Sequence, residues 1–142
     1  MVKVQPHKLV PLLMVQQAAA AVEFYKQGLG AEEAGRLPLN QDQAQVQVEL
    51  RIGSAVFYVC DLREDTPQPN GSSVRRVPAS VTLHLEVDDC DAAVARAAAA
   101  GAEVLMPPAD TTWGDRYARI RDPFGHQWSF AHSTSRPGRS AA

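Results

Sequence analysis

The sequence predicts an α+β fold made of two βαβββ modules in tandem. The first observation behind this prediction is an internal repeat. Val15 and Val22 recur as Val87 and Val94, each pair 72 residues apart, and Gly30-Ala31-Glu32 recurs after 71 residues. The second is that each repeat carries one helical apolar pattern, followed by alternating patterns typical of strands. The chain of 142 residues is thus about twice a unit of ~70 residues.

The first module is expected over about residues 8–61. Val22, Tyr25 and Leu29 fall on one face of a helix, and Gly30 suits the left-handed turn that ends many helices. The last two strands are expected to join at Arg51-Ile52-Gly53-Ser54. The expected order is a strand, a helix and three strands: 8–15, 18–29, 32–39, 44–51 and 54–60.

The second module is expected over about residues 79–132, in the same order. Asp89 or Asp88 can cap its helix through a side-chain carboxylate, and Gly101 takes the place of Gly30. The segment Asp122-Pro123-Phe124-Gly125-His126 is its hairpin turn. The expected elements are a strand, a helix and three strands: 80–87, 89–100, 103–106, 116–122 and 126–132.

The segment 62–78 joins the modules and is rich in Pro, Gly and Ser, so we expect an exposed linker there. The tail 133–142 is expected to be frayed. Because neither module alone contains much core, residues 1–142 are expected to form a single domain.

Composition narrows the function classes. Apolar residues make up 45% and charged residues 21%, as in ordinary globular proteins. A net charge of -2 gives no attraction for nucleic acid, and no apolar run is long enough to cross a membrane. Two cysteines are too few for a disulfide scaffold, so we expect a cytoplasmic protein. The apolar stretch at 9–15 loosely resembles a secretory leader, but the repeat explains it as a strand.

Alternation along the strands predicts which side chains share a face. Leu83 and Leu85 are expected to face the helix of their module, so Thr82, His84 and Glu86 lie on the opposite face. The same parity puts further polar residues on that face: Gln47, Glu49, Tyr117, Arg119 and Arg121. The first strand instead places Val10, Leu12 and Met14 there. A face that is part apolar and part charged is typical of a small-molecule pocket, and also of a subunit interface.

Several residues have both a functional and a structural interpretation. His84 can act as ligand or base near neutral pH, or as a hydrogen-bonded residue of a cavity wall. Arg119 and Arg121 can hold an anion, or form an ion-pair network with Glu49 across the sheet. Trp113 and Tyr117 can stack on a planar ligand, or pack within their loop.

Four residues are expected to have structural roles only. Trp128 and Phe130 are expected in the core, Cys90 as an inert thiol, and His132 as an exposed residue.

Three stretches resemble the vicinal oxygen chelate superfamily, which includes glyoxalases, bleomycin-resistance proteins and extradiol dioxygenases. They are 9–11 leading to 21–26, the stretch 85–92, and 113–117 leading to 121–128. The last is the most specific, because it joins two strands through a DPxG hairpin. The resemblance implies paired modules that form a curved mixed sheet around a concave cavity, with helices outside, often in a homodimer.

The resemblance does not carry over a metal site. In metal-dependent members the ligands come from the first and last strand of each module, usually as His, Gln or Glu. The aligned positions here are Val10, Phe57, Thr82 and Ser129, none of which is a normal ligand for a divalent ion. We therefore expect no metal cofactor.

The function that we expect is metal-free binding of a small organic molecule, as in the bleomycin-resistance branch. The predicted ligand-binding residues are Met14, Gln47, Glu49, Thr82, His84, Glu86, Trp113, Tyr117, Arg119, Arg121 and Ser129. No catalytic residue is assigned. The alternative is a metal-dependent glyoxalase-like lyase or dioxygenase, with a displaced metal site at His84, Glu86 and Glu49 and with Glu49 or Glu86 as base. An interaction module without a ligand is a third possibility.

Overall fold

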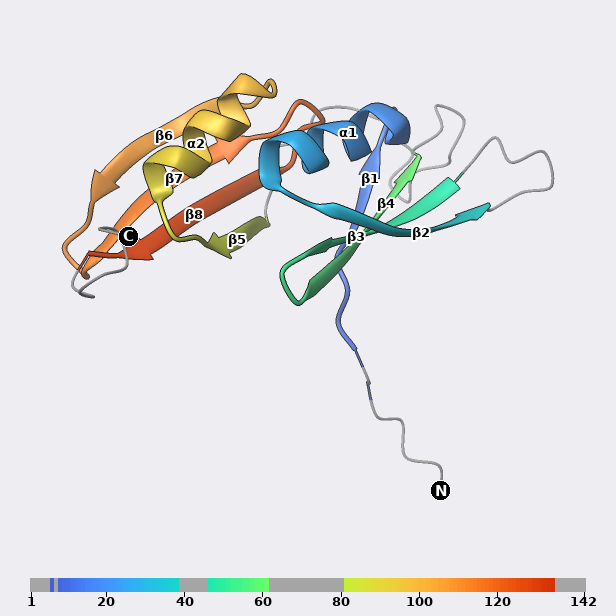
Figure 1. The fold of residues 1–142 in the computed structure, drawn as a ribbon, viewed down its shortest axis with the longest axis horizontal. Helices are drawn as coiled ribbons and strands as arrows, with labels where there is room; N and C mark the ends of the chain where they lie inside the picture. Colours follow the sequence, from blue (N-terminus) through green and yellow to red (C-terminus); the bar gives the residue numbers. More distant parts are fainter. Residues whose placement is uncertain (1–5, 7, 39–45, 62–80, 135–142) are drawn as a thin grey trace, which may run out of the picture.

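The computed structural model describes residues 6, 8–38, 46–61 and 81–134. It confirms the predicted α+β class, because each half of the chain is a βαβββ module (Figure 1). The first module comprises β1 (Leu12–Val15), α1 (Ala18–Leu29), β2 (Glu32–Pro38), β3 (Val46–Ile52) and β4 (Ala55–Asp61). The second comprises β5 (Thr82–Glu86), α2 (Cys90–Ala99), β6 (Glu103–Asp110), β7 (Asp115–Arg121) and β8 (Gln127–Ser133).

The strands form two four-stranded mixed sheets with the same order, β1-β4-β3-β2 and β5-β8-β7-β6. In each sheet the first strand runs parallel to the last, and the other neighbours are antiparallel. The first strand of each module is therefore an edge strand. Both helices lie on the same side of the two sheets (Figure 1).

Each helix begins and ends for a local reason. Asp89 caps α2 as predicted, since its carboxylate accepts a bond from the Ala92 amide at 3.1 Å. Gln17, at the same place in α1, makes no side-chain cap bond, and the Ala18 amide donates instead to Asp61 of β4 at 2.8 Å. Gly30 ends α1 with a left-handed φ of 75°, as its place in the sequence predicted.

The alanine-rich helices pack closely against each other. A Cβ on Gly28 of α1 would lie 3.1 Å from the Cβ of Ala100, so a side chain there would push the helices apart. Arg96 of α2 reaches across and donates to the carbonyl of Gln27 at 2.8 Å. Small side chains thus bring the two modules into contact through their helices.

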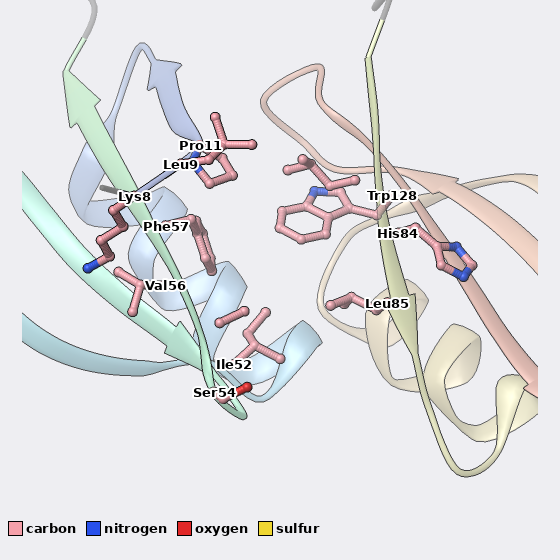
Figure 2. A pocket seen from close by; sticks show the side chains of 12 residues that line it. Lys8, Leu9, Pro11, Ile52, Ser54, Val56, Phe57, His84, Leu85 and Trp128 are labelled. Carbon is pink, nitrogen blue, oxygen red and sulfur yellow. The ribbon is translucent and has the colours of Figure 1, made fainter. Parts of the chain in front are cut away.

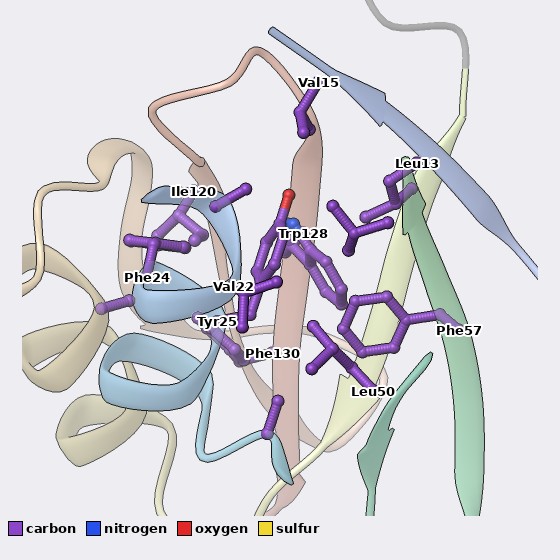
Figure 3. Close-up of a cluster of buried hydrophobic side chains, with 14 of the residues drawn as sticks. Leu13, Val15, Val22, Phe24, Tyr25, Leu50, Phe57, Ile120, Trp128 and Phe130 are labelled. Atoms are coloured by element: carbon purple, nitrogen blue, oxygen red, sulfur yellow. The ribbon is translucent and has the colours of Figure 1, made fainter. Parts of the chain in front are cut away.

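One core runs through both modules (Figure 3). Tyr25, Phe57 and Trp128 meet at its centre, with ring centroids 5.6–5.7 Å apart. The predicted core positions of Trp128 and Phe130 are confirmed, each with 2% of its surface exposed. Neither module closes its core alone, because these rings come from α1, β4 and β8.

Some predicted boundaries move. Strand β6 continues to Asp110, past the predicted end at residue 106, although Pro107 and Pro108 follow. It lies at the edge of its sheet with shifts in register, where proline costs no ladder bond. Ser133 still belongs to β8, while the linker 62–78 and residues 135–142 of the tail lie outside the described residues. Within the described part, no helix has the length and apolar character needed to cross a membrane.

Candidate functional site

The polar face of the second sheet gathers most of the predicted site residues. Strand pairing puts His84 of β5 opposite Ser129 of β8, and Ser129 opposite Arg119 of β7. In the neighbouring row Glu86 lies opposite Ala131, which lies opposite Tyr117. Because parity is shared along each row, these side chains project from the same face.

Aromatic rings cluster on this face. The imidazole of His84 and the ring of Tyr117 are parallel to within 17°, with centroids 6.3 Å apart. Trp113 meets Tyr117 edge-on at 6.3 Å, and 66% of its surface is exposed. The strand between His84 and Tyr117 carries only the small residues Ser129 and Ala131 there. We call Trp113, Tyr117, His84, Ser129 and Arg119 the aromatic-cationic cluster.

Two hydrogen bonds orient this cluster. His84 Nδ1 and Ser129 Oγ lie 2.7 Å apart, which ties the exposed imidazole to a buried hydroxyl. Arg119 Nη2 donates to the Tyr117 hydroxyl at 3.0 Å, and its guanidinium carbon lies 5.9 Å from the centre of that ring. The buried Nε of Arg119 has no hydrogen-bond acceptor among the described residues.

The other predicted residues do not join the cluster. Gln47 and Glu49 belong to β3 of the other sheet, where Glu49 pairs with Arg51 at 3.3 Å. Met14 is half-buried on β1, and its carbonyl accepts a bond from His126 Nε2 at 3.0 Å.

The remaining candidates, Arg121, Thr82 and Glu86, lie on the same strands as members of the cluster but make no contact with it that the structure describes. Arg121 pairs with Glu103 at 3.1 Å, and Glu49 lies in the other sheet, so the predicted ion-pair network of Arg119 and Arg121 with Glu49 does not form. Thr82 and Glu86 are exposed on β5 beside His84.

A groove of about 340 Å³ lies between the two modules (Figure 2). Its walls come from residues 8–11 before β1, from β4 and its hairpin, and from β5 and β8, and Phe57 and Trp128 project into it from opposite modules. His84 also lines it, but its ring and that of Trp128 lie on opposite sides of β5. The groove is therefore largely apolar, and His84 is the one lining residue that it shares with the aromatic-cationic cluster.

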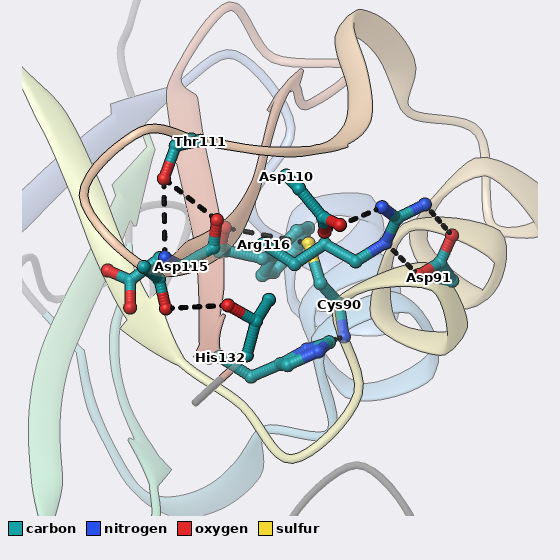
Figure 4. Close-up of polar contacts among 10 residues, drawn as sticks. Cys90, Asp91, Asp110, Thr111, Asp115, Arg116 and His132 are labelled. Atoms are coloured by element: carbon teal, nitrogen blue, oxygen red, sulfur yellow. Dashed lines mark hydrogen bonds and ion pairs between the residues drawn. The ribbon is translucent and has the colours of Figure 1, made fainter. Parts of the chain in front are cut away.

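A second cluster of polar residues lies at the start of α2, and its members bond to one another (Figure 4). Arg116 bonds to Asp91 at 2.6 Å and to Asp110 at 3.0 Å, and its hydrogen bond holds the pKa of Asp91 below the usual value. The Cys90 amide donates to His132 Nδ1 at 2.8 Å. The prediction of an exposed His132 is wrong, because this bond holds it in β8 with 5% exposure.

The Cys90 thiol is inert for a physical reason. It is fully buried and donates to the Phe130 carbonyl at 3.6 Å. Burial, together with the charge of Asp91, raises its pKa to about 11, which disfavours the reactive thiolate. The structure thus agrees with the expectation of an unreactive thiol.

Sequence reasoning missed a buried carboxylate at the junction of the modules. Asp122, 2% exposed, accepts bonds from the Tyr25 hydroxyl at 2.6 Å and from Trp128 Nε1 at 2.9 Å. It also accepts from the amides of Phe124 and His126, at 2.9 and 3.0 Å. A DPxG hairpin accounts for the amide bonds, but no local pattern points from Asp122 to Tyr25, 97 residues earlier.

The comparison with family models matches residues 7–130 to the Glyoxalase/Bleomycin resistance protein/Dioxygenase superfamily. The chain belongs to this superfamily. This confirms the resemblance read from the sequence.

Relatives of this glyoxalase-superfamily protein span most of its length. An uncharacterized protein of Mycobacterium tuberculosis is 41% identical over 133 residues, which cover 90% of this chain and 75% of that protein. The X-ray structure of an Arabidopsis thaliana gene product superposes with a TM-score of 0.67 at 30% identity, over 92% of this chain and 100% of that one. The crystal structure of TioX from Micromonospora gives a TM-score of 0.67 at 25% identity, over 90% and 99% of the two chains.

The residues at the superfamily's metal positions do not fit a metal ion, and one expected position needs correction. Phe57 packs on Tyr25 and Trp128 in the core, so the β4 residue on the polar face is Tyr58, which pairs with Glu49. Alignment on the hairpin glycines failed because Gly53-Ser54 separates β3 from β4, whereas residues 122–126 separate β7 from β8. This difference reverses the parity of one strand.

The corrected set is Val10, Tyr58, Thr82 and Ser129. It lacks a His, Cys or carboxylate ligand. Among the described residues no three His, Cys, Asp or Glu side chains are grouped to hold a metal, so His84, Glu86 and Glu49 do not come together in this chain.

Proposed function

We propose that this superfamily member is a metal-free binding protein for a small organic molecule, like the bleomycin-resistance branch. The observation that carries the proposal is that residues which are not normal ligands for a divalent ion stand at the metal-ligand positions on the polar face. At the four metal positions stand Val10, Tyr58, Thr82 and Ser129, and beside Ser129 lies the aromatic-cationic cluster. Aromatic faces with a few polar groups suit binding of an organic ligand better than coordination of an ion.

A second copy of the chain would complete the site. The cluster is open, with Trp113 66% exposed, while ligand pockets enclose most of a ligand's surface. The strands beside the groove are edges of their sheets, and three apolar residues near them are exposed: Leu9 (95%), Leu12 (48%) and Val81 (65%). The proposal therefore includes a homodimer that covers these edges.

The test combines metal content with ligand binding. Protein purified without chelator is expected to contain Zn, Ni, Mn and Fe far below one per chain, and chelator should leave its melting temperature unchanged. A thermal-shift panel of aromatic acids, phenols, aromatic amines and bleomycin is expected to contain at least one stabilising compound. Trp113→Ala, at an exposed position, should reduce that stabilisation.

Two results would contradict the proposal. Stoichiometric metal that chelator removes together with an activity would support the metal-dependent lyase or dioxygenase. A panel without any stabilising compound would support an interaction module. Glu23→Gln, at an exposed residue of α1, is the matched control for Trp113→Ala and should leave any shift intact.

A further inference from the structure

Arg119 differs from every other arginine that the structure describes. Arg36, Arg51, Arg116 and Arg121 each pair with a carboxylate. Arg96 donates to main-chain carbonyls at the end of α1. Among the described residues, Arg119 has no acidic partner and makes one side-chain hydrogen bond, to the neutral Tyr117 hydroxyl.

This cation is also half-buried rather than freely solvated. Its Nε is fully covered and lacks an acceptor among the described residues, and only Nη2 bonds to another described side chain. A sheltered charge without a counter-ion is unfavourable in the free protein. On that face Glu103 of the neighbouring strand β6 pairs with Arg121, and Glu86 of β5 is separated from β7 by β8.

The surroundings of Arg119 are flat and aromatic. Tyr117 lies beneath its guanidinium, His84 is parallel to Tyr117, and Trp113 offers an exposed indole. Ser129 and Ala131 have small side chains on β8, the strand between β5 and β7, so no bulky side chain fills the middle of this face. Guanidinium binds carboxylates through paired donors, and aromatic faces bind planar rings.

We propose that the aromatic-cationic cluster binds a planar aromatic anion, with a carboxylate on Arg119 and a ring stacked on the exposed indole of Trp113. The inference rests on the proposed function and adds the charge and shape of the ligand. It makes Arg119 the determinant of specificity for anions over neutral rings.

Isothermal titration with three probes tests this assignment on the full chain. The probes are 2-naphthoate, the neutral 2-naphthamide and the non-aromatic cyclohexanecarboxylate. We expect saturable binding of 2-naphthoate. The affinity for each of the other two probes should be lower by a factor of about ten or more, because 2-naphthamide lacks the charge and cyclohexanecarboxylate lacks the aromatic ring.

Variants then locate the charge. Arg119→Gln should weaken 2-naphthoate about tenfold and leave 2-naphthamide unchanged, whereas Arg119→Lys should restore part of the affinity. Arg51→Gln is the matched control, because it removes the same charge from the equivalent strand of the first module. It should bind 2-naphthoate as the wild type does.

Each contrary result has a separate meaning. Equal binding of 2-naphthoate and 2-naphthamide would overturn the anion assignment while leaving a metal-free binding protein intact. An absence of 2-naphthoate binding would also overturn it, and the function would then fall only if the wider panel failed as well. If Arg119→Gln does not fold, by circular dichroism, the comparison of probes on wild-type protein still decides.

Discussion

Asp122 is the residue on which both modules depend. Its buried carboxylate accepts one hydrogen bond from the Tyr25 hydroxyl of the first module and one from Trp128 Nε1 of the second. Burial, and then the charge of Asp122, raise the pKa of Tyr25 far above that of a free tyrosine. The phenol therefore stays protonated in the folded protein at any pH of practical use.

This coupling predicts how stability depends on alkaline pH. Above a pH of about 10 the unfolded chain loses the Tyr25 proton and the folded chain keeps it, so stability falls by up to ~1.4 kcal/mol per pH unit. Tyr25→Phe removes this dependence, and at pH 7.5 should cost about 1–3 kcal/mol because a donor to a buried carboxylate is lost. The difference between wild type and variant in urea unfolding should shrink between pH 9 and 11.

The control is Tyr58→Phe, which makes the same chemical change on the polar face of β4, away from Asp122. It should keep the alkaline decline of the wild type. A difference between wild type and Tyr25→Phe that stays constant from pH 8 to 11 would refute the coupling.

Among the elements, the two helices start in different ways. Helix α2 is capped by its own Asp89, whereas α1 begins at Gln17 without a side-chain cap and draws on Asp61 of β4. The N-terminus of the first helix is thus stabilised by a residue of its sheet, whereas that of the second is stabilised by its own N-cap residue.

A matched pair of substitutions tests this difference. Asp89→Ala should lower the free energy of unfolding by about 1 kcal/mol, because the Ala92 amide loses its acceptor. Gln17→Ala should change it by less than about 0.5 kcal/mol. Urea unfolding followed by circular dichroism measures both, and equal effects would show that the Asp89 bond does not stabilise α2.

The elements also show how far sequence reasoning reaches. The range 18–29 was exact for α1, because Gly30 and an apolar stripe mark it locally. Strand parity placed His84, Tyr117 and Arg119 on one face, since alternation depends only on neighbours. The parity of Tyr58, the burial of His132 and the partner of Asp122 depend on turn length or distant contacts, which no local pattern records.

At the scale of the molecule, exposed apolar side chains lie at or beside the first strand of each module. Leu12 on β1 and Val81 beside β5 are exposed, and both strands have one unpaired edge within the described chain. In the proposed homodimer this surface is covered.

Light scattering coupled to size exclusion tests the homodimer. We expect a mass of two chains for the wild type and of one chain for Leu12→Lys, since a charge at the interface is not tolerated. Leu37→Lys, on the opposite edge strand of the same sheet, should remain dimeric although Leu37 is equally exposed, at 56% against 48%. A wild-type mass of one chain would contradict the homodimer.

The bond between Tyr25 and Asp122 also makes the two repeats non-interchangeable. The first repeat supplies the phenol and has only the short Gly53-Ser54 turn where the second supplies the carboxylate. At the place of Tyr25 the second repeat has Arg96 or Ala97. A chain made of two first halves would have a phenol without an acceptor, and one made of two second halves a buried carboxylate without that phenol. The duplicated halves have thus become complementary parts, and neither can replace the other.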